Sequence, residues 1–303
     1  MTPSAAPLTR AAALVMVFVS LAWGSSFLLI KEALAVTDPF GVALSRVALG
    51  AVVLGFLPGA RRRVGRGAWP WIVALALVWM AIPLTLFAVA EQEISSATAG
   101  MINGSVPIFT AIVASLLARA LPGRVRLAGL ALGLLGILAI GVPGARTSPD
   151  APLAVLLVVG AVTLYGVAFN ITGWLQRRHG SLPVIFRSMA VAAVVLAPAG
   201  VPDLLAASPA PRGVLSMLLL GFVSTGAAFA LFTWLAGTLD ATRASVVTYA
   251  VPVVALLVGI TVGGESAHPL AVAGVLLVVT AAYLVQRPEP PPSPAVPEGS
   301  PPQ

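Results

Sequence analysis

The sequence predicts an all-α membrane protein with ten transmembrane helices, arranged as two inverted five-helix repeats with both termini in the cytoplasm. Three observations carry this prediction: an apolar composition, ten apolar runs and a similarity between the two halves of the chain. Of the 303 residues, 59% are hydrophobic and only 9% are charged, and the mean hydropathy is +1.02. Soluble domains carry about 25% charged residues, so the composition excludes a soluble globular protein.

Ten apolar runs follow a short polar start at residues 1–10, which we expect to be the cytoplasmic N-terminus. A helix needs roughly 20 apolar residues to cross the membrane, and its backbone must satisfy its own hydrogen bonds there, so each run is predicted to be a helix. A cleaved signal peptide is the alternative for the first run, which is long for that role. Residues 287–303 hold eight prolines and are predicted to be a disordered cytoplasmic tail. The runs lie near 11–30, 39–57, 69–90, 97–118, 125–142, 152–173, 183–199, 213–235, 243–262 and 268–286.

The distribution of Arg and Lys among the loops predicts the orientation. If the N-terminus is cytoplasmic, the inner side receives twelve of these residues and the outer side receives Lys31, Arg146 and Arg212. Cytoplasmic loops are enriched in basic residues, so both termini are expected inside the cell. The net charge of +7 therefore indicates membrane orientation and no nucleic-acid partner. The twelve are Arg10, Arg61, Arg62, Arg63, Arg66, Arg119, Arg124, Arg126, Arg177, Arg178, Arg243 and Arg287.

The two halves of the chain align with each other at an offset of about 145 residues. Phe87 aligns with Phe232, and at a slightly smaller offset Arg46 aligns with Arg187. A unit of five helices crosses the membrane an odd number of times, so its second copy must be inverted. Inverted repeats are typical of secondary transporters, whose halves move about a site at the midplane. We therefore predict repeats at residues 11–142 and 152–286 and favour a carrier, with duplication unrelated to transport as the alternative.

Two aligned prolines mark a candidate cavity. Proline has no N–H, so Pro107 frees the carbonyl of Asn103 and Pro252 frees that of Thr248. Both carbonyls are predicted near the midplane, where a free backbone group is tolerated only beside protein or a water-lined cavity. We interpret the two sites as symmetry-related cavity walls; a pair of structural kinks is the alternative. The same helix faces also carry Ser96, Gly100, Ala241 and Ser245.

Aromatic and polar side chains on other helices are candidates for lining the same cavity. Aromatic walls with a few polar atoms suit an amphipathic organic solute. Ordinary packing is the alternative for Trp23. The further candidates for substrate binding are Trp23, Ser26, Phe87, Tyr165, Asn170, Phe232 and Tyr249.

Four charged residues are candidates for gating or for binding a charged group, because charges in a membrane are costly. Arg46 and Arg187 either bind an anionic group such as a carboxylate, extend toward an interface or pair with a neighbouring helix, and the last two roles are favoured. Lys31 and Glu91 are predicted near the outer ends of their helices, where they either pair as an outer gate or are solvated. The glutamates lie at marginal depth, so the sequence does not establish proton coupling.

The composition argues against several other chemistries. The chain has no Cys and two His, which excludes disulfides and leaves little for a metal site, so we expect no metal and no cofactor. The helices lack the residue pairs of intramembrane proteases, and the chain lacks the phosphate-binding loop of an ATP-driven pump, so we expect no enzyme. A carrier of a small molecule and a non-transporting scaffold or sensor subunit remain.

A stripe of glycines in the fifth run, Gly129, Gly133 and Gly136, predicts close packing against another helix. The partner helix belongs either to the other half of the chain or to a second subunit. The sequence therefore leaves a homodimer open.

A series of short motifs follows the same order in both halves. The first half contains Trp23-Gly24-Ser25-Ser26-Phe27, Lys31, Pro39, Arg46, Ser95-Ser96-Ala97, Asn103 and Pro107, and the second contains Ala241 to Ser245, Tyr249-Ala250-Val251-Pro252, Gly263-Gly264-Glu265 and Ala273-Gly274. This order resembles the EamA family of the drug/metabolite transporter superfamily, over residues 11–287.

The resemblance implies a ten-helix, multi-pass transporter in the lipid bilayer of the cell membrane. Its substrate would be a small organic metabolite, such as an amino acid or a drug-like solute, which alternating access moves across the membrane, with export as the direction the family favours. The resemblance also implies a central cavity lined by helices 1, 3, 4, 6, 8 and 9. This chain departs from the family pattern at Arg119-Ala120, where the second half has Gly264-Glu265.

Overall fold

The computed structural model describes residues 9–119, 121–238 and 246–286. Within these ranges the chain is helical and contains no β-strand. Eight stretches of helix are long and apolar enough to cross a membrane, and two shorter apolar helices cover Pro39–Gly55 and Val247–Thr261. Each of the ten apolar runs thus contains helix, whereas ten complete crossings stay a prediction. The predicted tail at 287–303, together with Ala241 and Ser245, lies outside the described residues.

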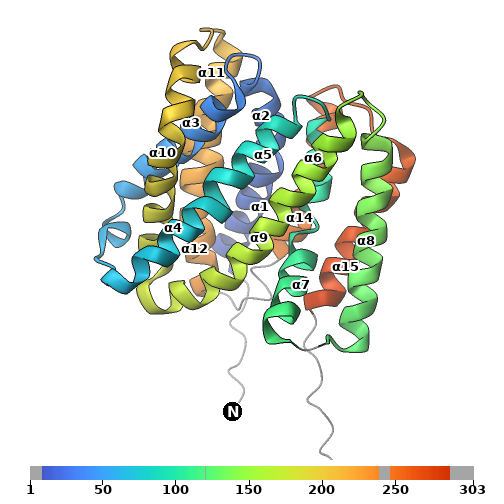
Figure 1. Cartoon of the computed structure of the whole chain (residues 1–303), viewed down its shortest axis with the longest axis horizontal. Helices are drawn as coiled ribbons and strands as arrows, with labels where there is room; N and C mark the ends of the chain where they lie inside the picture. The colour runs from blue at the N-terminus through green and yellow to red at the C-terminus, as the bar shows by residue number, and fades with distance from the viewer. Residues whose placement is uncertain (1–8, 120, 239–245, 287–303) are drawn as a thin grey trace, which may run out of the picture.

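The helices pack as a bundle in which most axes run in the same general direction (Figure 1). Four stretches are built from more than one helical piece, as the bounds below show. In chain order the helices are α1 (Arg10–Gly24), α2 (Ser26–Ala33), α3 (Pro39–Gly55), α4 (Trp69–Leu75), α5 (Ile82–Ala90), α6 (Ser96–Asn103), α7 (Val106–Ala118), α8 (Arg124–Gly144), α9 (Ala151–His179), α10 (Ser181–Leu205), α11 (Pro211–Leu218), α12 (Ala228–Thr238), α14 (Val246–Thr261) and α15 (Pro269–Gln286).

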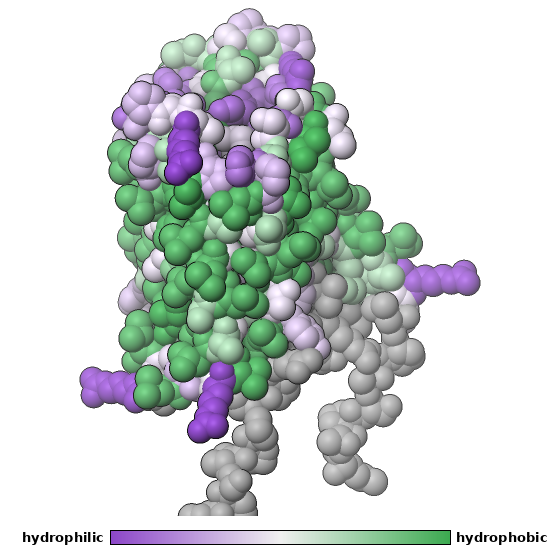
Figure 2. Space-filling model, turned by 90° about the vertical axis from the view of Figure 1, so that its right-hand side faces the viewer, coloured by the Kyte–Doolittle hydropathy of each residue, from purple (hydrophilic) through white to green (hydrophobic). Residues whose placement is uncertain are grey.

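The face of the molecule in Figure 2 carries a broad hydrophobic belt, with hydrophilic residues gathered toward the two ends. Large apolar side chains stand exposed along the helices; Val194 of α10 is 74% exposed and Leu276 of α15 is 66% exposed. A soluble protein of this size rarely exposes so continuous an apolar surface. The belt is the surface expected of a protein that lipid surrounds.

The fourth apolar run is interrupted, which corrects the expectation of one helix kinked in its middle at Pro107. Helix α6 ends at Asn103, and α7 begins at Val106, so Pro107 lies in the first turn of α7. Proline is tolerated there because the first N–H groups of a helix have no intrahelical acceptor. Pro252, in contrast, lies inside α14.

The interruption brings the two proline sites together. A Cβ added to Gly104 would lie 2.7 Å from Cγ of Pro252, so only a glycine allows α14 to approach the break this closely. The break between α6 and α7, next to Pro107, therefore packs against Pro252 of α14.

The third and eighth runs share another irregularity. A π-helical segment, Ala76–Ala81, separates α4 from α5, and a second, Leu219–Ala227, separates α11 from α12. The two segments occupy corresponding places in the aligned halves. Each inserts extra residues into the helical turn and so changes which side chains face inward beyond it.

The glycine stripe of α8 packs against α15, which joins the first and second halves of the same chain. A Cβ on Gly136 would lie 2.9 Å from the carbonyl oxygen of Gly274, and one on Gly274 would lie 2.8 Å from that of Gly136. Of the two partners that the sequence left open, this face therefore uses the other half of its own chain. A homodimer stays a prediction, now without support from this stripe.

Candidate functional site

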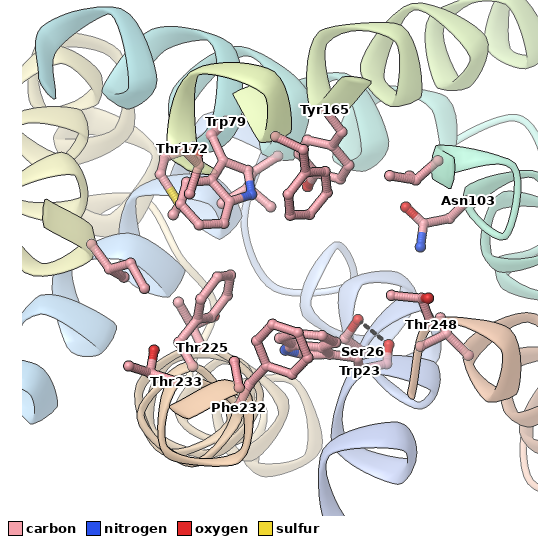
Figure 3. Close-up of a pocket in the computed structure, with 18 of the residues that line it drawn as sticks. Trp23, Ser26, Trp79, Asn103, Tyr165, Thr172, Thr225, Phe232, Thr233 and Thr248 are labelled. Atoms are coloured by element: carbon pink, nitrogen blue, oxygen red, sulfur yellow. Dashed lines mark hydrogen bonds between the residues drawn. The ribbon is translucent and has the colours of Figure 1, made fainter. Parts of the chain in front are cut away.

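A cavity of about 350 Å³ lies among the helices of both halves. Figure 3 shows its labelled residues around an open space, with Trp79, Tyr165 and Asn103 on one side and Phe232 and Trp23 on the other. Nine residues that the sequence selected as candidates line it. They are Trp23, Ser26, Arg46, Phe87, Asn103, Pro107, Tyr165, Phe232 and Thr248.

Eight of the described residues that line the cavity are aromatic. Trp23 lies 5.0 Å from Phe232 and 5.3 Å from Phe229, measured between ring centroids, and Trp79 lies 5.5 Å from Phe229 and 5.7 Å from Phe169. These tilted and edge-on contacts hold each ring against its neighbours. The wall is therefore a connected aromatic surface contributed by both halves of the chain.

A few polar atoms interrupt this apolar wall. Oδ1 of Asn103, at the C-terminal end of α6, is buried and accepts no hydrogen bond from the described residues. Ser26 Oγ donates to the carbonyl of Trp23 at 2.6 Å, which satisfies the hydroxyl where α1 gives way to α2. Asn103 and Thr248 lie at the same side of the view in Figure 3 and come from α6 and α14, aligned helices that pack against each other. The wall of the cavity thus contains a buried amide oxygen, that of Asn103, which the described residues leave without a hydrogen bond.

Arg46 is the one charged residue among the described residues that line the cavity. It lies on α3 and is 8% exposed, and its Nε donates to Oγ1 of Thr225 at 2.9 Å. The side chain therefore does not extend to an interface, and its hydrogen bond joins α3 to the segment Leu219–Ala227, as the expected pairing between helices would.

Glu91 directly follows the membrane-spanning stretch Arg66–Ala90 and is completely buried. Neither of its carboxyl oxygens has a hydrogen-bond partner among the described residues. Burial raises the pKa of the Glu91 carboxyl well above its ordinary value; the positive charge of Lys31 opposes this rise, and the negative charge of Glu265 adds to it. The expectation of a solvated Glu91 is therefore wrong.

The other candidates lie outside the cavity and make structural contacts. Asn170 Nδ2 donates to the carbonyl of Thr110 at 3.1 Å, which ties α9 to α7, and the hydroxyl of Tyr249 donates to the carbonyl of Ala282 at 3.4 Å. Pro252 packs against the break between α6 and α7. Their predicted role in substrate binding has no support from their position.

The two remaining charged candidates also bind backbone carbonyls. Arg187 Nη1 donates to the carbonyls of Ala60 at 3.0 Å and Pro183 at 3.1 Å. Lys31 Nζ donates to the carbonyl of Ile94 at 3.2 Å and to that of Glu91. Lys31 therefore connects α2 to the loop between α5 and α6 and forms no ion pair with the carboxyl of Glu91.

Several lining residues were missed by the sequence analysis. They include Trp79 and Thr225, both of which lie in the π-helical segments. A regular helical period does not predict their direction, because the wider turn shifts the inward face. The aromatic residues Phe169 and Phe229 carried a usable signal, since each lies close in sequence to a residue that had been selected. The cavity is also lined by residues from α3 and α10, which are the second and seventh apolar runs. The family resemblance implied a cavity lined only by the first, third, fourth, sixth, eighth and ninth runs.

The cavity reaches one end of the bundle only. Gln176 and Ser181, on either side of the junction between α9 and α10, belong to its wall. The described loops at the opposite end, near residues 34–38, 91–95, 145–150, 206–210 and 263–268, contribute no lining residue. Because Arg177 and Arg178 place the α9–α10 junction on the predicted cytoplasmic side, the cavity is expected to face the cytoplasm.

Contacts between elements close the opposite end. Asp203 Oδ2 accepts from the backbone N–H of Gly41 at 3.0 Å, and the Asp203 carbonyl accepts from the hydroxyl of Thr37 at 3.0 Å. An ion pair joins Arg212 to Glu32. In the part of the chain that the structure describes, no group of three His, Asp or Glu residues could hold a metal ion.

The model of the EamA-like transporter family matches residues 10–142 and 152–287. The chain belongs to this family. It is accordingly a multi-pass membrane protein of a transporter family. The two matched segments coincide with the two stretches that align with each other within the chain.

Two named relatives match nearly the whole length of this chain, and a third matches about half of it. An uncharacterized transporter of Archaeoglobus fulgidus is 24% identical, covering 88% of this chain and 95% of the relative. A probable terminal-alkyne amino-acid exporter of Streptantibioticus cattleyicolor is 27% identical, covering 90% of this chain and 92% of the relative. An S-adenosylmethionine/S-adenosylhomocysteine transporter of Chlamydia trachomatis serovar L2 is 32% identical over 53% of this chain and 51% of the relative.

The fold is also found among solved structures. A crystal structure, titled only as that of a protein, superposes with a TM-score of 0.63 at 20% sequence identity, covering 91% of this chain and 96% of the other. At this identity the similarity concerns the fold of the chain alone.

Proposed function

We propose that the chain is a secondary transporter that moves a small organic metabolite across the cell membrane by alternating access, in the direction of export. In this proposal the ten apolar runs are ten crossings in two inverted repeats, residues 11–142 and 152–286, with both termini in the cytoplasm. The observation that carries the proposal is a cavity between the halves that reaches one end of the bundle and is closed at the other. Alternating access requires a state with this geometry.

The lining supports an amino acid or a drug-like solute as the substrate. Its aromatic rings would cover an apolar body, while Asn103 and Arg46 would orient the polar part. Ligand sites of about 300–1,000 Å³ with few polar groups are typical for small organic molecules. An amino-acid exporter and a transporter of S-adenosylmethionine are among the relatives by name, which agrees with this size class.

The first test measures flux in proteoliposomes that contain the purified chain. A panel of radiolabelled amino acids and organic cations and anions is assayed by counterflow, and we expect saturable flux for at least one compound. Thr233→Trp places an indole in the cavity that Thr233 lines and is expected to abolish this flux. Ser208→Trp, on an exposed loop at the closed end, adds the same side chain outside the cavity and is expected to retain it.

Two results would contradict the proposal. Flux no greater than that of empty liposomes for the whole panel would favour the alternative, a membrane scaffold or sensor subunit built on the same repeats. Equal flux in Thr233→Trp and the wild type, with both folded, would show that the solute does not pass through this cavity.

A further inference from the structure

The two arginines that the repeat aligns have different environments. Arg187 donates to two backbone carbonyls, which account for its place in the fold. Arg46 donates to one hydroxyl, that of Thr225, and lines the cavity. The position that is structural in the second half is therefore directed toward the cavity in the first.

Most of the hydrogen-bonding capacity of Arg46 is unused. A guanidinium carries five N–H donors, and the described residues use only Nε of Arg46. They give it no ion pair, and Glu91, which acts on it electrostatically, lies beyond contact. A buried positive charge without a partner is costly, so such a site favours an anion that enters with the right geometry.

The terminal nitrogens of Arg46 remain reachable. Buried polar atoms without a partner occur on Glu91, Asn103 and three serines of the described chain, and none is on Arg46. Its small remaining exposure therefore belongs to atoms that meet the cavity. A guanidinium presents two parallel N–H groups that match the two oxygens of a carboxylate.

The surroundings of Arg46 define the rest of the ligand. Phe87 and Tyr165, whose ring centroids lie 5.9 Å apart, line the cavity with Arg46, and the aromatic wall of Trp23 and Phe232 lies across it. None of the described lining residues carries a negative charge. The site thus combines one cation with an aromatic surface and no group that would bind a simple cation.

We propose that Arg46 is the subsite for an anionic group of the transported solute, so that the substrates are amphipathic organic anions or zwitterions with a carboxylate and an aromatic or apolar body. This assignment rests on the proposed transport function, because it names the chemistry of the solute that the cavity holds. The aligned Arg187 has no part in the subsite.

A charge series on one ring tests the assignment. Phenylacetate, phenylacetamide and phenethylamine carry one aromatic ring and a charge of minus one, zero and plus one. Their binding to the full chain in nanodiscs is measured by titration calorimetry at neutral pH. We expect phenylacetate to bind at least roughly tenfold more tightly than phenylacetamide, as hydrogen bonds between charged groups typically allow, and phenethylamine to bind most weakly.

Matched variants locate the effect. Arg46→Gln is expected to bring phenylacetate and phenylacetamide within about twofold of each other, because a neutral amide no longer distinguishes them. Arg46→Lys is expected to keep the preference for the acid with a smaller ratio, since it retains the charge without the paired donors. Arg187→Gln removes the aligned arginine and is expected to keep the wild-type ratio.

The proposal is overturned if the wild type fails to bind phenylacetate, or binds the three probes equally, and this result needs no variant to fold. It is also overturned if Arg46→Gln, shown by its melting curve to be folded, keeps the full preference. Transport that persists without a preference for acids would reject the subsite and leave the transport function standing. Absence of flux for every solute in proteoliposomes would instead reject the transport function.

Discussion

The Glu91 carboxyl is buried at the closed end of the cavity without a hydrogen bond from the described residues. An ionised carboxylate in such a place is unfavourable, so the buried form is the neutral acid. The charged groups that act on it are Lys31 on α2, Glu265 after α14 and Arg46 on α3. Opening the closed end would hydrate this carboxyl and allow it to ionise.

We expect Glu91 to make the stability of the folded chain depend on pH. Its pKa is raised in the folded state, so the folded state binds the proton more tightly than the unfolded state. The stabilisation is complete below the ordinary glutamate value of 4.5 and is lost as the pH rises toward the folded value. Glu91→Gln should remove a slope of at most about 1.4 kcal/mol per pH unit from the unfolding free energy in this range.

Melting temperatures measured in detergent over a series of pH values check this expectation. Glu93→Gln makes the same chemical change two residues away, on an exposed side chain whose carboxyl accepts a hydrogen bond from Ser148. It should leave the wild-type profile unchanged. Identical pH profiles for the wild type and Glu91→Gln would show that the buried carboxyl does not titrate in this way.

The residues of the candidate site that were predicted correctly all lie outside the two π-helical segments. Trp23, Asn103 and Thr248 line the cavity as predicted, because local polarity and spacing identified their faces. Trp79 and Thr225 were missed because π-helical segments change the direction of side chains, and a sequence does not reveal an inserted residue in a turn. Asn170 was selected for its polarity, yet a neighbouring carbonyl already satisfies it.

The helix α6 is held by a residue from the other half of the chain. Its first N–H groups are buried, so water cannot satisfy them. Glu265 Oε1 accepts from the N–H of Ser96 and Oε2 accepts from that of Ala97, both at 2.9 Å. Gly264, at φ +65°, makes the turn that directs Glu265 to this helix end.

The first half of the chain keeps the turn at the position aligned with Gly264 but does not keep the glutamate that follows it. Arg119 adopts φ +50°, close to the left-handed conformation of Gly264, so the turn is kept without glycine. The residue aligned with Glu265 is Ala120, which has no carboxylate. The Gly-Glu motif was recognised from the sequence, but its partner was not predictable, because the contact joins residues of different halves.

Removing the carboxylate of Glu265 should destabilise the chain. Glu265→Ala leaves two buried N–H groups at the start of α6 without an acceptor, and each such loss costs about 1–3 kcal/mol. We expect a clear fall in melting temperature. Asp150→Ala is the matched control, because Asp150 occupies the N-cap position of α9 without a side-chain capping bond.

The result for Asp150→Ala should lie within about 0.5 kcal/mol of the wild type, as for exposed substitutions in general. If both variants melt together with the wild type, the contact between Glu265 and α6 contributes nothing to stability. If Asp150→Ala falls as far as Glu265→Ala, the loss reflects general sensitivity to acidic residues at helix starts.

At the scale of the whole molecule, the all-helical membrane architecture was predictable because the membrane imposes it. Long apolar runs must be helices in lipid, and the order of the short motifs identified the family. Which end of the cavity is closed was not predictable, because the closure depends on pairs such as Asp203 with Gly41 and Arg212 with Glu32, far apart in the sequence. Such pairs depend on tertiary packing and not on local pattern.

The orientation and the accessible end of the cavity lead to one expectation for thiol labelling. The chain has no cysteine, so an introduced cysteine is its sole thiol. Ser181→Cys lies at the mouth of the cavity, Ser26→Cys lies in its wall, and Ser208→Cys lies on an exposed loop at the closed end.

With cytoplasmic termini and a cavity open to the cytoplasm, a membrane-impermeant thiol reagent should modify Ser181→Cys and Ser26→Cys faster in inside-out vesicles. The same reagent should modify Ser208→Cys faster in right-side-out vesicles. The three rates separate two errors: reversal of all three rejects the orientation, whereas reversal of Ser26→Cys alone rejects the open end while the orientation stands.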